Sequence, residues 1–220
     1  MTGLLKKDYF LLKSNLKTYI IVVLFYIILG FVSDNASMIA SMLIMLFAMQ
    51  AITTLSWDDN AKWEPYALTM PVSRHLLVLA KYIFSFLLVI TGVILSTISS
   101  LVSCLLSHTA YSLSDFILPL VFACIYSVFM AILLPIIFKL GVEKARTVMY
   151  IIFIVPFLLI VGGAALFERF FSDNSAITDM LLRCGKQLAP FMPVIIPVVL
   201  LAAIIISYRA AINIIDKKDF

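Results

Sequence analysis

The residues with reactive side chains are few in this chain, and they do not fall together. The two histidines, His75 and His108, belong to different polar segments, and neither H-E-x-x-H nor G-x-S-x-G occurs. The three cysteines, Cys104, Cys124 and Cys184, lack the C-x-x-C spacing of zinc sites and redox pairs. The sequence therefore predicts no catalytic residue, no metal site and no residue that binds a cofactor.

The sequence also lacks an energy source for transport. The phosphate-binding pattern G-x-x-x-x-G-K-[ST] is absent, because the only Gly-Lys pair, Gly185–Lys186, lacks the partner glycine and precedes Gln187. The apolar runs carry no charged residue or histidine in their middle, where ion-coupled transporters need one. If the chain moves a substrate, another polypeptide must supply the energy.

The composition predicts an integral membrane protein made of helices. Of the 220 residues, 64% are hydrophobic and 13% are charged, which is more apolar surface than a soluble domain can cover. The apolar runs are unbroken rather than alternating, which favours helices over a barrel. We predict an all-α polytopic fold, a single transmembrane domain over 1–220. The predicted spans are 18–32, 36–55, 83–106, 115–138, 147–167 and 188–207.

Residues 1–17 are predicted to form an interfacial helix that lies on an anionic leaflet. On a helical wheel Lys6, Lys13 and Lys17 share a narrow arc, apart from the leucines and Tyr9. A charged tail that only signals topology is the alternative. The net charge of +4 is spread over the span ends, so it does not indicate binding to nucleic acid.

The positions of lysine and arginine place both termini in the cytoplasm. With six spans, three basic residues lie outside, namely Arg169, Arg183 and Lys186. Thirteen lie inside: Lys6, Lys7, Lys13, Lys17, Lys62, Arg74, Lys81, Lys139, Lys144, Arg146, Arg209, Lys217 and Lys218.

Residues 57–82, which we call the elbow, form the longest polar interval on this inner side. Asp58, Asp59 and Asn60 can cap the start of a helix. One face of that helix would hold Trp63, Tyr66, Ala67 and Met70. Pro71 would end it, and Ser73 would cap a second helix that runs into the membrane. An interfacial loop that only joins two spans is the alternative.

A row of methionines in the second span and a row of serines in the third each have two interpretations. The methionines of the second span and the serines of the third can pack between helices, or they can line a path for apolar substrates. The candidate path residues are Met42, Met45, Met49, Ser96 and Ser100.

Three prolines, Pro190, Pro193 and Pro197, fall in the first half of the last span. Proline removes a backbone donor, so we expect a broken or re-entrant start there. Residues 208–220 are expected to form a polar tail.

The elbow resembles the same segment of the permeases of ABC-2-type exporters. The matching pattern is D-D-x-x-K-W-x-x-Y-x-L-T-x-P-V-S-R-x-x-x-V-L-x-K-Y, from Asp58 to Tyr82. In particular it is similar to small bacterial permeases like those that export phenol-soluble modulins and other amphipathic peptides. The resemblance implies a location in the bacterial cytoplasmic membrane.

In that family the elbow supplies a coupling helix between spans two and three, which docks on an ABC ATPase subunit. The positions that the resemblance assigns to docking are Asp58, Asp59, Lys62, Trp63, Glu64, Tyr66, Met70, Pro71, Ser73 and Arg74. It further implies two permease subunits, identical or related. The separate ATPase subunits would bind ATP and Mg, and membrane lipid and an amphipathic peptide substrate would be further partners.

The implied function is export of amphipathic peptides or lipophilic toxins, without enzymatic activity in this chain. A non-transporting sensor, or an immunity protein that binds a toxic peptide, is the alternative. An adjacent gene with a phosphate-binding loop would favour the exporter.

Overall fold

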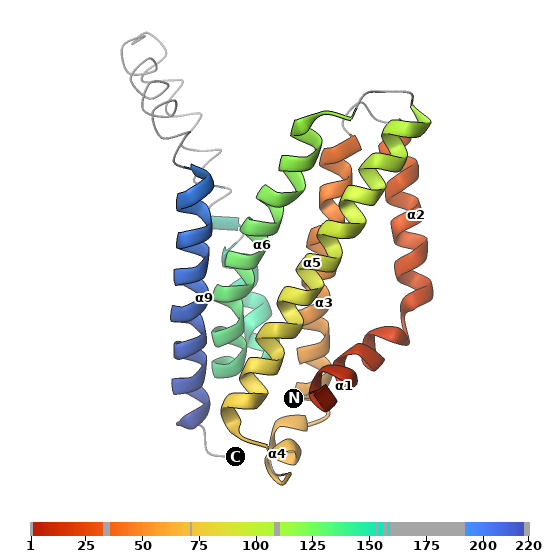
Figure 1. Ribbon diagram of the computed structural model, residues 1–220. Coiled ribbons are helices and arrows are strands. Elements are labelled where there is room, and N and C mark those ends of the chain that lie inside the picture. Colours follow the sequence, from red (N-terminus) through yellow and green to blue (C-terminus); the bar gives the residue numbers. More distant parts are fainter. Residues whose placement is uncertain are drawn as a thin grey trace, which may run out of the picture.

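The computed structural model describes residues 2–32, 36–70, 72–107, 111–152, 154–155, 158 and 192–217. Every regular element within these ranges is a helix, as the sequence predicts. The helices are α1 (Thr2–Lys13), α2 (Leu16–Val32), α3 (Ala36–Asn60), α4 (Trp63–Leu68), α5 (Arg74–Leu106), α6 (Leu113–Leu140) and α9 (Met192–Asp216). Residues 142–152 are helical as well. The long helices stand side by side, with α1 and α4 at their lower end (Figure 1).

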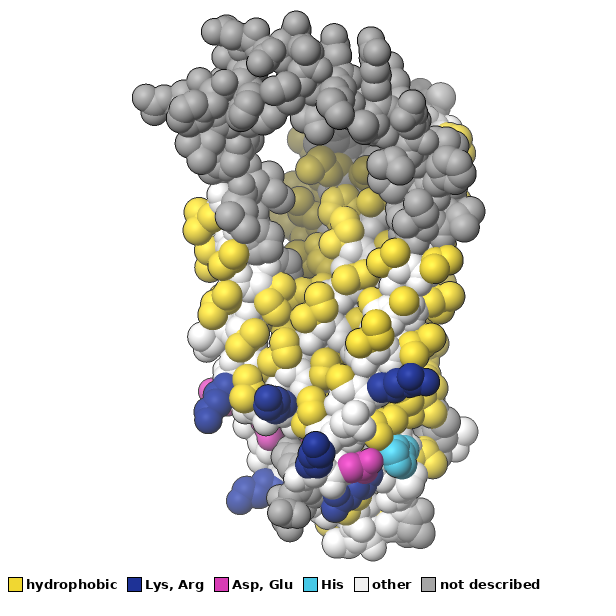
Figure 2. All heavy atoms as spheres, turned by 90° about the vertical axis from the view of Figure 1, so that its left-hand side faces the viewer, with side chains coloured by type: hydrophobic (Ala, Val, Ile, Leu, Met, Phe, Trp, Pro, Cys, Tyr) yellow, Lys and Arg dark blue, Asp and Glu magenta, His cyan; other side chains and the backbone are white. Residues whose placement is uncertain are grey.

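Four helices in the described part of the chain are long and apolar enough to cross a membrane. They are α3, α5, α6 and α9, and the bent pair of α1 and α2 adds a fifth if it counts as one span. Hydrophobic side chains cover the middle of one face, and charged side chains gather toward its lower end (Figure 2). This arrangement matches a bilayer-spanning bundle. Most of the predicted fifth span, 147–167, lies outside the described residues.

The N-terminal helix turns sharply into the first long apolar helix. The axes of α1 and α2 differ by 66° across the break at Ser14 and Asn15. The Ser14 hydroxyl donates to the Leu11 carbonyl at 2.8 Å, which competes with the helical hydrogen-bond pattern. The lysine-bearing helix α1 therefore lies across the lower end of the bundle.

The last helix is longer and more regular than its prolines suggest. We expected a broken or re-entrant start over the first half of span 188–207. Residues 188–191 lie outside the described residues, and from Met192 through Asp216 α9 is helical with Pro197 inside it. Most of the predicted polar tail is helical too. The predicted outer segment 168–187 lies outside the described residues.

The helices α3 and α5 pack closely against each other. Gly92 of α5 lies against Ile44 of α3, so close that a Cβ added there would be 2.9 Å from the Ile44 Cα. The serines of α5 continue this face, and Ser103 donates to the Ile27 carbonyl of α2 at 3.4 Å. A face of glycine and serine lets neighbouring backbones approach closely.

Candidate functional site

The elbow forms a short helix, but its bounds differ from those expected. The sequence placed a helix over 58–70, whereas α3 continues through Asn60 and α4 covers only Trp63–Leu68. Thr69 ends α4 by donating its hydroxyl to the Tyr66 carbonyl at 2.8 Å. Pro71 lies outside the described residues. Asp58 and Asp59 therefore belong to the last turn of α3, and they do not cap a new helix.

A strained residue makes the sharp corner between α3 and α4. Lys62 has φ 49° and ψ 43°, which is the left-handed region that favours glycine. We expect Lys62→Gly to raise the free energy of unfolding by up to about 1 kcal/mol, because the strain exceeds the entropic cost of glycine. Lys62→Val should lower it, since a β-branched residue fits this region worst. Detergent-induced unfolding of both variants measures the two effects.

Between α4 and the helix bundle, four charged side chains form a buried cluster that joins three helices. We call it the charge cluster, and its members are Lys7 and Asp8 of α1, Asp58 of α3 and Lys81 of α5. Lys7 Nζ donates to both carboxylate oxygens of Asp58 at 2.6 and 2.7 Å. Lys81 Nζ donates to both oxygens of Asp8 at 2.8 Å and contacts Asp58 Oδ2 at 2.5 Å.

The charge cluster is balanced and mostly shielded from solvent. Its side chains are 23% (Lys7), 1% (Asp8), 9% (Asp58) and 12% (Lys81) exposed. Two lysines and two aspartates alternate, so each charge contacts two opposite charges. Burial of charges is tolerated only with such pairing. The charge cluster therefore fixes the relative positions of α1, α3 and α5 at the lower end of the bundle.

The first residue of α4 is attached directly to this cluster. Lys7 Nζ lies 4.3 Å from the centre of the Trp63 ring, in a cation–π contact, and Trp63 packs against Tyr66 with ring centres 5.4 Å apart. Beside this contact, a cavity of about 50 Å³ is lined both by α4 and by the four residues of the charge cluster. Ala67 is buried on the same inner side of α4.

Asp59 bonds to a different helix from Asp58. Its Oδ2 accepts a hydrogen bond at 3.0 Å from the N–H of Val142, at the start of the helix over 142–152. A carboxylate at a helix start satisfies a free N–H and complements the helix dipole. Arg146 of the same helix donates to the Ser56 hydroxyl at 3.3 Å. The end of α3 is thus bonded to three helices: to α1 and α5 through Asp58, and to the helix over 142–152 through Asp59 and Ser56.

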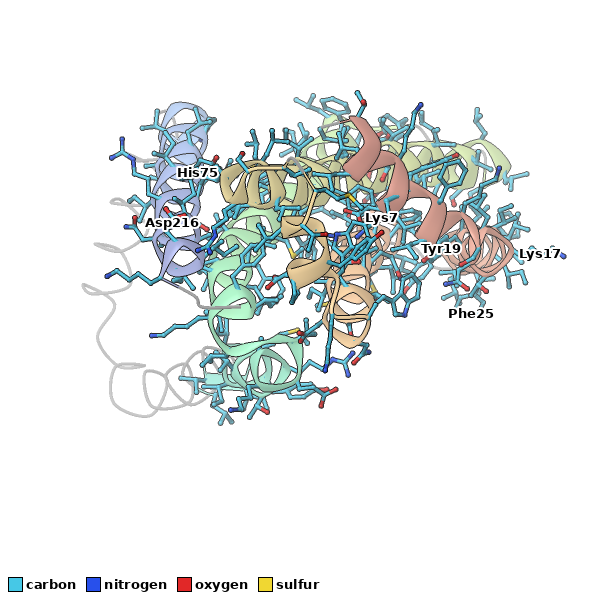
Figure 3. All side chains as sticks on the ribbon, turned by 90° about the horizontal axis from the view of Figure 1, so that it is seen from below. Lys7, Lys17, Tyr19, Phe25, His75 and Asp216 are labelled. Carbon is cyan, nitrogen blue, oxygen red and sulfur yellow. The ribbon has the colours of Figure 1, made fainter. Side chains whose placement is uncertain are left out.

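The second half of the elbow is bonded to the end of α9. Arg74 Nη1 donates to the carbonyls of Ile215 and Asp216 at 3.0 and 3.1 Å, where the helix leaves acceptors without partners. His75 Nε2 lies 3.9 Å from Asp216 Oδ2, and the two side chains lie next to each other in Figure 3. Ser73 occupies the N-cap position of α5, as expected, but no side-chain capping bond forms there.

The outer side of the elbow carries apolar surface. Tyr66 is 57% exposed and Met70 is 39% exposed, whereas Trp63 is only partly exposed. The predicted apolar face is therefore divided, with Trp63 and Ala67 directed to the bundle and Tyr66 and Met70 directed away. Glu64 is partly exposed at the cavity rim.

Comparison with known proteins assigns the chain to a family. The family model described as ABC-2 family transporter protein matches residues 3–216. The chain belongs to the ABC-2 transporter family. Neither the curated proteins nor the solved structures gave a match. This ABC-2 protein is thus an integral membrane component of a transporter, of a family whose members work with an ABC ATPase.

The five candidate path residues of this ABC-2 protein do not line one common surface. Met42 and Met45 are exposed on α3, and Met49 is partly buried. Ser96 and Ser100 are fully buried on the packed face of α5. The serines thus occupy a helix-packing position within the chain.

Sequence reasoning missed the charge cluster at the base of this ABC-2 protein. It placed Lys7, Asp58 and Lys81 on the same side of the membrane, which was the available signal. It did not pair them, because they lie 51 and 23 positions apart along the chain. Asp8 drew no attention, since an acidic residue in a basic helix has no pattern of its own.

Proposed function

We propose that this chain is the permease subunit of an ATP-driven exporter, and that α4 is its coupling helix. A separate cytoplasmic ATPase would bind and hydrolyse ATP with Mg, and a second permease subunit, identical or related, would complete the membrane part. Closing of the ATPase would push on α4 from the cytoplasmic side. The substrates proposed are amphipathic peptides or lipophilic toxins, on the basis of the resemblance of the elbow to peptide-exporting permeases.

The observation that supports the proposal is that α4 is exposed on one side and contacts the charge cluster on the other. Its outer side presents Tyr66 and Met70, and its inner side contacts Lys7 of the charge cluster. Aromatic side chains of this kind dominate small protein interfaces. A force on α4 would therefore reach α1, α3 and α5 through buried ion pairs rather than through a flexible loop.

We propose a division of roles among the ten predicted docking residues. Tyr66 and Met70 are exposed and available for contact with an ATPase. In contrast, Asp58, Asp59 and Arg74 hold elements of this chain. We propose that these three act by positioning α4, while the exposed residues of α4 form the contact itself.

The test of docking is retention of the ATPase by a Tyr66 variant. We expect Tyr66→Ala to weaken association by about 2 kcal/mol, a loss of roughly 30-fold, as for an interface anchor. Co-purification of the ATPase with the tagged chain from native membranes measures this. Tyr150→Ala is the matched control, because Tyr150 is 58% exposed, like Tyr66, but lies on another helix.

Unchanged ATPase retention by Tyr66→Ala, with Met70→Ala added, would contradict docking through α4. Absence of any ATPase beside the wild-type chain would instead favour the sensor or immunity protein. Trp63→Ala is a poor first variant, because loss of its contact with Lys7 also disturbs the charge cluster.

A further inference from the structure

A second site lies on the side of the bundle away from α9. An apolar groove of about 730 Å³ runs between α2 and α5, with α3 as its floor and α1 across its lower end. Figure 1 shows α1 crossing at the lower end of α2 and α5. The 66° bend between α1 and α2 creates this enclosure, because α1 closes the end that a straight helix would leave open.

The groove offers hydrocarbon-like walls along its length. Above Lys6 and Lys13 at its lower end its surface is almost wholly apolar, and Tyr19, Gln50 and Thr91 bond within the protein. The Tyr19 hydroxyl donates to the Gln50 carboxamide oxygen at 2.9 Å, and the Thr91 hydroxyl donates to the Leu88 carbonyl at 2.8 Å. The part of a ligand that lies between α2 and α5 therefore gains little from polar atoms and must be apolar.

The length of the groove corresponds to one leaflet. Along α5 its lining extends from Phe84 to Leu95. At 1.5 Å per residue this is about 16 Å. Half of the hydrocarbon core of a bilayer is about 15 Å. An acyl chain of one leaflet therefore matches the groove from its lower end to its upper end.

The lower end of the groove is positively charged. Lys6 and Lys13, two turns apart on α1, line it and are exposed, and no Asp or Glu is among its lining residues in the described part of the chain. The nearest acidic residue in sequence, Asp8, is held by Lys81 and Lys7 in the charge cluster. The lysines thus face the region where lipid headgroups lie.

We propose that this groove binds one anionic phospholipid. An acyl chain lies between α2 and α5, and Lys6 and Lys13 contact the headgroup phosphates. A second copy of this chain fits less well, since a symmetric contact through the groove would bring the lysines of both α1 helices together. A bound lipid of this kind would hold α1 against α5, the same two helices that the charge cluster joins.

The test is native mass spectrometry of the full chain, purified with its natural partners, in the presence of added lipid. The probes are dioleoyl phosphatidylglycerol and dioleoyl phosphatidylcholine, which share acyl chains and differ in charge. Each lysine near an anionic headgroup contributes about fivefold in affinity. We therefore expect phosphatidylglycerol to bind about 25-fold more tightly, and Lys6→Gln with Lys13→Gln to abolish this preference.

The matched control is Lys17→Gln with Lys139→Gln, which removes the same charge from two exposed lysines outside the groove and should leave the preference intact. Lys17 lies at the outer edge of the bundle in Figure 3. Equal binding of the two lipids by the wild-type chain would overturn the proposal, as would an equal loss of preference in the control variant.

A second pair of variants tests the groove itself. Thr91→Phe fills its middle and should weaken binding of both lipids at least about tenfold, since the apolar contacts of the acyl chain are lost. The neighbouring Ile90→Phe adds a similar ring outside the groove and should have no effect. If Thr91→Phe fails to fold by circular dichroism, Leu24→Trp narrows the groove from the other wall.

Unchanged lipid binding by these groove variants would overturn the proposal. A change of subunit number without loss of lipid would do the same, and would identify the groove as an interface between copies. Because ATPase retention is not measured here, failure of this test is separate from failure of docking through α4.

Discussion

Replacement of Asp58 by Asn is expected to lower the free energy of unfolding by about 3 kcal/mol. The change leaves Lys7 and Lys81 to share a single carboxylate, that of Asp8, in a site where the side chains are 1–23% exposed. Removal of one partner from a buried ion pair is costly because the remaining charge is left without compensation. Unfolding with sodium dodecyl sulfate in mixed micelles, followed by circular dichroism, measures the loss.

The paired variant separates charge balance from loss of shape. Lys7→Gln combined with Asp58→Asn restores neutrality, with Asp8 and Lys81 still bonded. We expect the double variant to be at least about 1 kcal/mol more stable than the sum of the single effects. Strict additivity would mean that Lys7 and Asp58 do not act as a pair.

A second carboxylate serves as the control for this measurement. Asp216 is 47% exposed and its contact with His75 is 3.9 Å long. Exposed ion pairs contribute little, so Asp216→Asn should change stability by less than about 0.5 kcal/mol. A loss at Asp216 as large as that at Asp58 would show that the effect does not depend on burial.

The charge cluster bears on function as well as on stability. The side of Trp63 that faces the bundle contacts Lys7, so the position of α4 depends on the same ion pairs. On the proposed mechanism, Asp58→Asn would loosen α4 and reduce export more than it reduces ATPase retention. Tyr66→Ala would instead reduce ATPase retention more than it reduces export.

The sequence predicted the class of fold well because that class depends on composition. Long unbroken apolar runs in a chain that is 64% hydrophobic have few physical solutions other than membrane helices. The presence of a bent polar segment near 57–82 was also readable, because proline and capping residues act locally.

The exact ends of the helices in the elbow could not be predicted from the sequence, because contacts with distant residues determine them. The Asp58–Asp59–Asn60 triplet has the composition of a helix start, and local chemistry favoured that interpretation. Lys7 and Lys81 bind Asp58, and Val142 binds Asp59, which stabilises α3 as a continuous helix through these residues. Tertiary contacts therefore outweighed the local preference.

For the last span, proline was expected to break the helix within its first half. Among the described residues α9 is helical from Met192 with Pro197 inside it, while Pro190 lies outside the described residues. The effect of a proline depends on its position relative to the first helical turn, which local sequence alone does not give.

Replacement of Gly92 by Ala should separate α3 from α5 and lower stability by about 1–3 kcal/mol. The added Cβ would lie 2.9 Å from the Ile44 Cα and 3.3 Å from the Phe47 Cβ, where carbon atoms need about 3.5–4.0 Å. Overpacking of this kind outweighs the gain of up to about 1 kcal/mol from removing a glycine inside a helix. Gly92→Leu should be more severe and should abolish export.

Two further variants test whether the effect of Gly92→Ala comes from the clash with the Ile44 backbone. Gly3→Ala also removes a helical glycine, but nothing lies within 4 Å of its added Cβ, so we expect no loss of stability. Shortening the partner, Ile44→Ala, should not rescue Gly92→Ala, because the closest atom is the backbone Cα, which remains. Rescue would show that α3 and α5 are further apart than 2.9 Å implies, and that side chains alone separate them.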